Sequence, residues 1–152
     1  MPTVLHNRIF IARTPAQVYA YVTRPWLWHE WHPNSRSATA DREILQVDDR
    51  FDETIAVQPL SPLPLTLLRA TRYRVLTAEP GVCWEVHGEM RDGWLRIRYD
   101  FVAENGGTRF ERTLTYAASG ASRLLMPLLR PRMARNSVIA LENLRKRLEK
   151  SP

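Results

Sequence analysis

The sequence has 152 residues, of which 44% are hydrophobic and 25% charged, with a formal net charge of +6. A chain of this length can bury one substantial core, so we expect a single domain over residues 1–152. No run approaches the roughly 20 apolar residues that a membrane-spanning helix needs, and the N-terminus lacks the basic and apolar regions of a secretory signal. The single cysteine, Cys83, cannot form an internal disulfide and suits a reducing cytoplasm, so we predict a cytoplasmic protein with a buried, inert thiol.

The positive charge is concentrated between Arg123 and Lys150, mostly on the side of a predicted helix that faces water. A solvated helix face explains this distribution more simply than a nucleic-acid interface. The sequence also lacks a recognition-helix, zinc-finger or RNA-binding signature. We therefore expect no nucleic-acid partner.

The first elements are a strand and two short helices. Val4 to Ala12 alternates as a strand, with Leu5 on the same face as Ile9 and Ile11. Thr14, Pro15 and Gln17 then form the start signal of a helix, with Thr14 as N-cap and Gln17 completing a capping box. A second short helix is predicted from Pro25 to Trp31, before Pro33 ends it.

This second helix lies in the densest aromatic segment of the chain, Trp26 to Pro33. His29 and His32 are spaced to share a helix face, as metal ligands can. No third ligand has a recognisable spacing, so we expect no metal and no other cofactor. We instead predict that Trp28 and Trp31 wedge the short helices against a sheet, with the imidazoles near a cavity mouth.

From Arg36 onward the apolar period changes to two, which is typical of strands. Asn105-Gly106-Gly107 predicts a hairpin turn, and the prolines between Pro59 and Pro64 interrupt the pattern. The expected strands span residues 37–45, 50–58, 67–78, 82–87, 94–103 and 108–117. Their short connections predict antiparallel neighbours with one solvated face.

The C-terminal stretch has helical spacing. Its apolar stripe comprises Ala134, Val138, Leu141, Leu144 and Leu148. We predict that this helix begins at Pro131 and that residues 120–130 form a separate helical turn. The whole pattern predicts an α+β fold, a curved antiparallel β-sheet gripping a long C-terminal α-helix, with two short helices after the first strand.

This order of elements resembles the START-like, helix-grip superfamily (SRPBCC), which includes the bacterial polyketide cyclase/dehydrase and lipid-transport group. The stretches that carry the resemblance are residues 8–12, 14–18, 25–33, 107–110 and 140–145. The resemblance implies an elongated apolar cavity between the sheet and the terminal helix, and hence a small hydrophobic ligand. The residues expected to line this cavity are Trp28, Trp31, Phe51, Glu53, Ile55, Tyr73, Trp84, Ile97, Tyr99, Phe110, Arg112, Leu114, Tyr116, Val138 and Leu141.

Two charged residues interrupt the predicted inward faces. Glu53 lies between Phe51 and Ile55, and Arg112 lies in the same way between two apolar residues of the last strand. A buried charge needs a partner, water or a ligand. The two side chains are therefore either an internal ion pair, or a site in which Arg112 anchors a carboxylate or carbonyl group while Glu53 orients it or moves a proton. A slipped strand register that leaves both in water is the third possibility.

Three functions remain open. The first is a non-catalytic carrier or sensor of a lipid or polyketide-like molecule, because no nucleophile motif is present. The second is a polyketide cyclase, aromatase or dehydratase, with Glu53, Arg112 and His32 as candidate catalytic residues. The third is an adaptor that uses the basic helix and the Leu60–Leu68 loop to contact a membrane or a protein partner, and the leucines of this loop also allow a homodimer.

Overall fold

The computed structural model describes residues 2–58, 63 and 65–150. Within them the chain forms seven strands, two α-helices and one 3₁₀ helix, η1. The elements in chain order are β1 (Thr3–Ile11), α1 (Pro15–Val22), η1 (Pro25–Glu30), β2 (Ser35–Ala40), β3 (Arg50–Val57), β4 (Leu67–Glu79), β5 (Cys83–Met90), β6 (Gly93–Glu104), β7 (Gly107–Ala118) and α2 (Gly120–Lys150).

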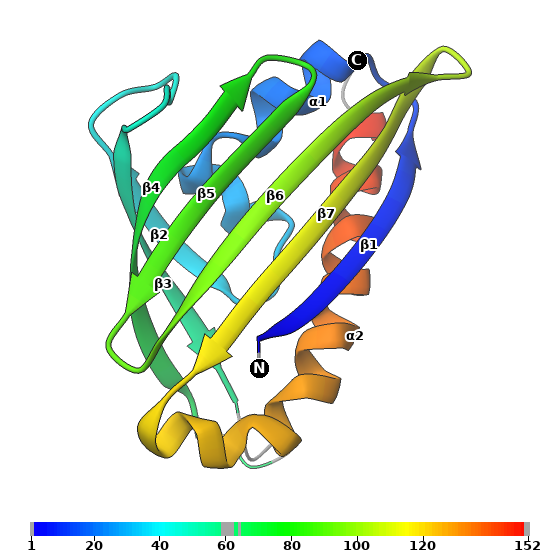
Figure 1. Ribbon diagram of the computed structural model, residues 1–152. Helices are drawn as coiled ribbons and strands as arrows, with labels where there is room; N and C mark the ends of the chain where they lie inside the picture. Colours follow the sequence, from blue (N-terminus) through cyan, green and yellow to red (C-terminus); the bar gives the residue numbers. More distant parts are fainter. Residues whose placement is uncertain (1, 59–62, 64, 151–152) are drawn as a thin grey trace.

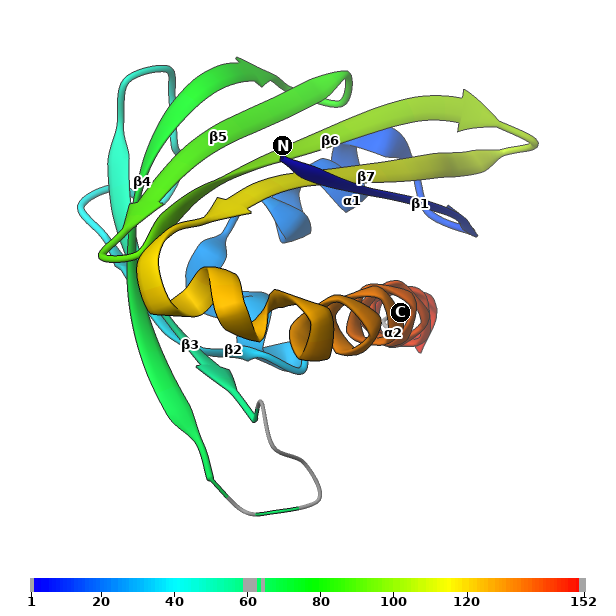
Figure 2. The ribbon, with the colours of Figure 1, turned by 60° about the horizontal axis from the view of Figure 1, so that its bottom comes forward.

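All seven strands form one antiparallel sheet in the order β1-β7-β6-β5-β4-β3-β2. The sheet curves strongly, and its concave side faces α2 (Figures 1 and 2). The short helices α1 and η1 close one end of the space between the sheet and α2 (Figure 1). This architecture confirms the predicted α+β helix-grip fold.

The two turn signals that the sequence offers most clearly are both present. Asn105 and Gly106 have φ values of 48° and 77°, and they connect Glu104 to its partner Gly107 across a tight hairpin. At the start of α1, the Gln17 amide donates to the Thr14 hydroxyl at 3.2 Å, and the Thr14 amide donates to the Gln17 side chain at 3.0 Å. The predicted hairpin and capping box are therefore confirmed.

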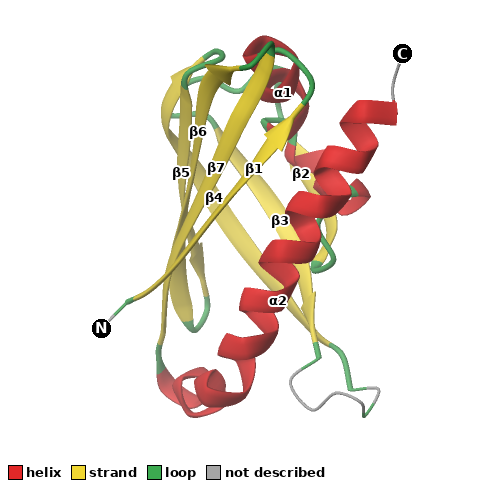
Figure 3. Cartoon of the chain, turned by 90° about the vertical axis from the view of Figure 1, so that its right-hand side faces the viewer, coloured by secondary structure: helices red, strands yellow, loops and turns green. Residues whose placement is uncertain are grey.

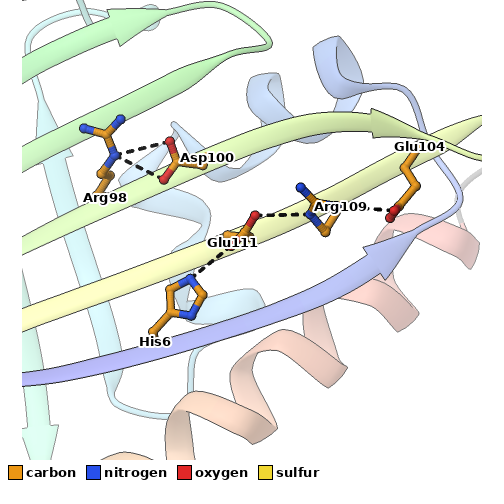
Figure 4. Close-up of polar contacts among 6 residues, drawn as sticks. All are labelled: His6, Arg98, Asp100, Glu104, Arg109 and Glu111. Carbon is orange, nitrogen blue, oxygen red and sulfur yellow. Dashed lines mark hydrogen bonds and ion pairs between the residues drawn. The ribbon is translucent and has the colours of Figure 1, made fainter.

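The convex face of the sheet is solvated and carries ion pairs both within a strand and between neighbouring strands. Figure 4 shows six of these side chains: His6, Arg98, Asp100, Glu104, Arg109 and Glu111. Arg109 lies 3.2 Å from Glu111 and 3.4 Å from Glu104. Exposed pairs of this kind contribute little stability. The alternation of polar and apolar residues fixes the strand register instead, because a slip by one residue would turn the apolar side chains toward water.

The concave face holds the core. Leu95, Ile97, Tyr99 and Phe101 alternate along β6 and are all buried, as predicted. Trp28 of η1 packs edge-on against Phe51, Tyr73 and Trp84, with ring centroids 5.6 to 6.0 Å apart. Its indole N–H donates to the Val22 carbonyl at 2.8 Å. Trp28 thus fastens both short helices to the sheet.

The start of the terminal helix differs from the prediction. Helix α2 begins at Gly120 and contains both Pro127 and Pro131, so the predicted start at Pro131 is wrong. Its first turns run across the end of the sheet before the helix changes direction and climbs along the open side (Figures 1 and 3). The ring of Pro131 crowds the carbonyl of Pro127 four residues earlier, which bends the helix without ending it. None of the described helices is long and apolar enough to cross a bilayer.

The buried face of α2 also differs from the predicted stripe. Leu141, Leu144 and Leu148 are buried as expected, but Val138 is 53% exposed. Ser137 is buried in its place, because its hydroxyl accepts a hydrogen bond from Arg112 inside the molecule. A search for apolar spacing cannot find a buried serine, and it therefore assigns the neighbouring valine to the wrong side.

Strand β2 ends at Ala40, earlier than the predicted 45, although Leu45 is buried in the connection that follows. Residues 60–62 and 64 of the predicted Leu60–Leu68 loop lie outside the described residues, so its proposed role stays a prediction. The described Leu63, Leu65 and Leu68 are exposed by about half or more of their surface.

Candidate functional site

Two small cavities adjoin between the concave face of the sheet and α2. We name them by a lining residue, the Arg112 cavity (about 110 Å³) and the Met126 cavity (about 120 Å³). Six apolar residues contribute to both walls: Ile55, Val57, Leu95, Leu114, Leu129 and Met133. Leu129 and Met133 come from α2, so the helix forms part of the partition between the two spaces.

Glu53 is held at the Arg112 cavity by hydrogen bonds from two strands. The Ser35 hydroxyl of β2 donates to one carboxylate oxygen at 2.7 Å, and the Tyr73 hydroxyl of β4 donates to the other at 2.9 Å. Glu53 is only 5% exposed. Burial raises the pKa of Glu53 above its usual value, and the two hydrogen bonds and the charge of Arg112 only partly oppose this rise.

Tyr73 reaches Glu53 because a glycine faces it on the neighbouring strand. Gly88 pairs with Tyr73 in the sheet, and a Cβ atom at position 88 would lie 2.7 Å from the Tyr73 ring. The missing side chain leaves room for the ring over the concave face. Burial and the nearby Glu53 raise the pKa of Tyr73 well above 10, so its hydroxyl keeps its proton.

Arg112 enters from β7, where it pairs with Asn7 of β1 and Tyr99 of β6. Its side chain is 4% exposed. One terminal nitrogen donates to the Ser137 hydroxyl at 3.3 Å, and the other lies 3.4 Å from Nε2 of His32. Its Nε atom is buried and has no hydrogen-bond partner among the described residues.

His32 faces Arg112 from the segment after η1. The Asn34 amide donates to Nδ1 of the imidazole at 3.2 Å. Burial, together with the charge of Arg112, lowers the pKa of His32 to about 3, so the ring is neutral near pH 7. A neutral ring that accepts at Nδ1 carries its hydrogen on Nε2, the atom that faces the guanidinium.

In this tautomer the contact between His32 and Arg112 joins two hydrogen-bond donors, whereas in the other tautomer Nε2 accepts from the guanidinium. A guanidinium has no acceptor atom, and the Nε2–H of this tautomer cannot accept. Together with the unpartnered Nε of Arg112, these groups present convergent donors at the cavity wall. Such an arrangement suits an oxygen atom that accepts hydrogen bonds, as in a carbonyl, enolate or carboxylate group.

Glu53 and Arg112 do not form the direct ion pair that the sequence made one possibility. No salt bridge joins them in the described part of the chain, although the charge of Arg112 acts on the Glu53 carboxyl. Both are buried, which also rules out the slipped register. The Glu53 carboxyl accepts from Ser35 and Tyr73, one guanidinium nitrogen of Arg112 donates to Ser137, and both residues line the same cavity.

Most of the predicted lining residues lie where expected. Nine of them line the Arg112 cavity: Trp28, Trp31, Glu53, Ile55, Tyr73, Ile97, Tyr99, Arg112 and Leu114. Tyr116 lines the Met126 cavity instead. His32, predicted as a catalytic candidate, also lines the Arg112 cavity. Whether any of these residues acts on a ligand stays a prediction.

The other predicted residues lie elsewhere. Phe51 and Trp84 are covered by Trp28, and Phe110 packs against Tyr99 and Phe101, so all three belong to the solid core at the closed end. Leu141 is buried in the same core but lines neither cavity, and Val138 points outward.

Sequence reasoning missed five residues that line the Arg112 cavity: Asn34, Val57, Leu95, Leu129 and Met133. Val57 and Leu95 belong to the alternating inward sets and could have been included. Leu129 and Met133 were hidden by the wrong helix start, because they lie on either side of Pro131. Asn34 follows Pro33 in a connection without periodicity, so no pattern indicated it.

The histidine pair predicted to share a helix face does not come together, because His29 is exposed while His32 lies at the cavity. In the part of the chain that the structure describes, no group of three His, Cys, Asp or Glu side chains is placed to hold a metal ion.

The chain is similar to a known family and to several solved structures. The profile of the family described as polyketide cyclase / dehydrase and lipid transport matches residues 2–149. No curated protein matches the sequence. The Zhui aromatase/cyclase from Streptomyces sp. R1128 has a similar structure, with a TM-score of 0.73 and 10% identity over 99% of this chain and 95% of that chain.

Two further solved structures are similar over nearly their whole length. TTHA0849 from Thermus thermophilus has a TM-score of 0.72 and 17% identity, covering 98% of this chain and 100% of that chain. CV1439 from Chromobacterium violaceum has a TM-score of 0.69 and 12% identity, covering 97% and 98%. At these identities the likeness establishes the fold.

Proposed function

Because the chain belongs to the polyketide cyclase/dehydrase and lipid-transport family, we propose that it binds a small hydrophobic molecule between the sheet and α2. The bound molecule presents an oxygen acceptor to Arg112 and His32. The observation that carries this proposal is the buried Nε of Arg112, which has no partner among the described residues, beside His32 on the wall of the same cavity. A buried donor without a partner costs free energy, and a ligand oxygen in the cavity would recover it.

The size of the cavities sets the kind of ligand. Each space, about 110 or 120 Å³, is smaller than the roughly 300–1,000 Å³ of most ligand pockets. A compact ring system is a better match to one cavity, and a longer molecule must displace Leu129 and Met133 to occupy both. Methionine is unbranched and adapts easily to such a change.

A matched pair of ligands tests this proposal. Titration calorimetry should show that 1-indanone binds more tightly than indane, which has the same carbon skeleton without the carbonyl oxygen. Loss of one charge-assisted hydrogen bond should reduce affinity by about tenfold. Arg112→Met should remove the preference, whereas Arg96→Met on the convex face should leave it intact.

Equal binding of the two ligands would count against the acceptor role of the ligand oxygen. Absence of binding by 1-indanone, together with no displacement of a fluorescent fatty acid and no apolar molecule extracted from the purified protein, would count against ligand binding altogether.

A second candidate function is catalysis of cyclisation, aromatisation or dehydration of a polyketide-like chain. Its support is the position of the Glu53 carboxyl, which lies on the wall of the same cavity as Arg112. The raised pKa of this carboxyl suits proton transfer. In this account Arg112 and His32 stabilise an enolate oxygen while Glu53 moves a proton. A poly-β-ketone substrate would be followed by the absorbance of its aromatic product, and unchanged turnover in Glu53→Gln and Arg112→Met would eliminate this role.

A further inference from the structure

A second concave site lies beside the Arg112 cavity, between α2 and the strands β2 and β3. This groove has a volume of about 290 Å³. Its polar lining comes from three arginines and three amide side chains: Arg36, Arg132, Arg135, Asn34, Gln58 and Asn136. We call it the arginine groove.

The arginine groove is positively charged without compensation from its own walls. None of its lining residues is acidic. Arg36 and Arg135 are exposed, and neither forms an ion pair with an acidic side chain of the described residues. Guanidinium groups on facing elements, with amide donors between them, match the oxygens of a phosphate or carboxylate group.

Asn34 connects this groove to the Arg112 cavity, because it lines both. Its side-chain oxygen accepts from Asn136 of α2 at 2.9 Å, and its side-chain nitrogen donates to the Ala56 carbonyl of β3 at 2.8 Å. Its backbone amide donates to His32 at 3.2 Å. One residue therefore joins the helix, the strand and the imidazole, and a ligand that occupies both the groove and the cavity must displace this side chain.

We infer that the natural ligand is amphipathic. Its anionic phosphate or carboxylate group lies in the arginine groove, and its apolar part, with the acceptor oxygen, enters the Arg112 cavity. This inference rests on the proposed binding function. The groove supplies exposed positive charge, which suits the anionic end of the ligand, while the mainly apolar lining of the cavity suits the other end.

Three ten-carbon ligands test this inference by titration calorimetry at low ionic strength. Decyl phosphate, decanoate and decanol share the alkyl chain and differ in the charge of the head group. We expect at least one of the two anions to bind about tenfold more tightly than decanol, with a preference that weakens as salt is added. The anion that binds more tightly identifies the head-group class.

The matched variants are Arg36→Gln/Arg135→Gln and Arg123→Gln/Arg130→Gln. Both remove two positive charges, and the second pair lies outside the arginine groove, where it lines a separate surface hollow near the start of α2. The first variant should bind all three ligands within about threefold of one another, while the second keeps the preference of the wild type. Circular dichroism and thermal unfolding check that both variants fold.

Equal binding of decanol and both anions by the wild-type protein would overturn the arginine groove as an anion site and leave the proposed function standing. The same loss of preference in both double variants would overturn it as well, because the attraction would then follow net charge alone. If none of the three ligands binds, this inference and the proposed function for alkyl ligands both fail.

Discussion

At the residue scale, the site consists of a carboxyl whose two oxygens each accept a hydrogen bond and a guanidinium that has one nitrogen without a partner among the described residues. Glu53 receives hydrogen bonds from Ser35 and Tyr73, whereas Arg112 has a buried Nε without a partner among the described residues. This asymmetry indicates where a ligand atom is needed. The opposite shifts of the Glu53 and His32 pKa values give two tests.

The first test concerns His32, whose pKa is lowered from 6.5 to about 3. Between these values the unfolded chain binds a proton that the folded chain does not, so the free energy of unfolding should decrease as the pH falls below 6.5. At about pH 5 the expected loss is up to about 2 kcal/mol relative to about pH 7. Urea unfolding of wild type and His32→Gln at both pH values measures it.

The variant should lose less stability than the wild type over this range, and His29→Gln, at an exposed position, should behave as the wild type does. Equal losses in the wild type and His32→Gln would mean that the His32 imidazole is not held neutral by its surroundings.

The second test concerns Glu53, whose pKa is raised above 4.5. The folded protein then holds this proton more tightly than the unfolded chain, so the stability present below pH 4.5 is lost as the pH rises through the folded-state pKa. Glu53→Gln stays neutral throughout. Its free energy of unfolding relative to wild type should therefore increase with pH, as measured by urea unfolding from about pH 4 to pH 8.

The exposed Glu89→Gln is the matched control, because it removes the same charge from the convex face. A difference between wild type and Glu53→Gln that does not vary with pH would contradict the raised pKa.

The two buried charges could be predicted from the sequence, and their partners could not. Glu53 and Arg112 each interrupt a regular period-two pattern, so their burial followed from their neighbours. Ser35, Ser137 and Asn34 belong to no such pattern, since their positions depend on how β2, α2 and the segment after η1 pack together. The donor arrangement at His32 depends on one hydrogen bond from Asn34, which is visible only in three dimensions.

At the element scale, α2 closes the core at one end and lines the cavities at the other. Leu144 and Leu148 pack in the core, while Leu129 and Met133 line both cavities near the bend at the prolines. The alternating strands and their turns were predictable because each signal is local. The start of α2 and its buried face were not predictable, because the two prolines suggested a helix start where the structure has only a bend.

Met133→Ala tests the role of α2 as a partition. Shortening this side chain should join the two cavities and lower the free energy of unfolding by about 1–2 kcal/mol, because apolar contacts are lost. At the same time, long alkyl ligands should gain affinity relative to short ones. A titration series of alcohols from six to twelve carbons measures this shift.

Val138→Ala is the matched control, since Val138 lies on the same helix but 53% exposed on its outer side. An unchanged dependence on chain length in Met133→Ala would show that Met133 does not limit the length of the bound molecule.

At the scale of the whole molecule, the sheet, the short helices and α2 enclose a site that has an apolar interior, converging donors at its wall and a charged groove at its edge. Family membership and fold agree with a binding role, and these three features together define the ligand that we propose. The cytoplasmic location, the possible homodimer and the possible membrane contact stay predictions.

The most direct test of the central claim is a crystal structure of the protein in complex with 1-indanone. We predict that the ring lies between the sheet and α2 in the Arg112 cavity, with its carbonyl oxygen within hydrogen-bond distance of Arg112 Nε and His32 Nε2. A ligand bound only outside this cavity, or a cavity that stays empty at a saturating ligand concentration, would contradict the account.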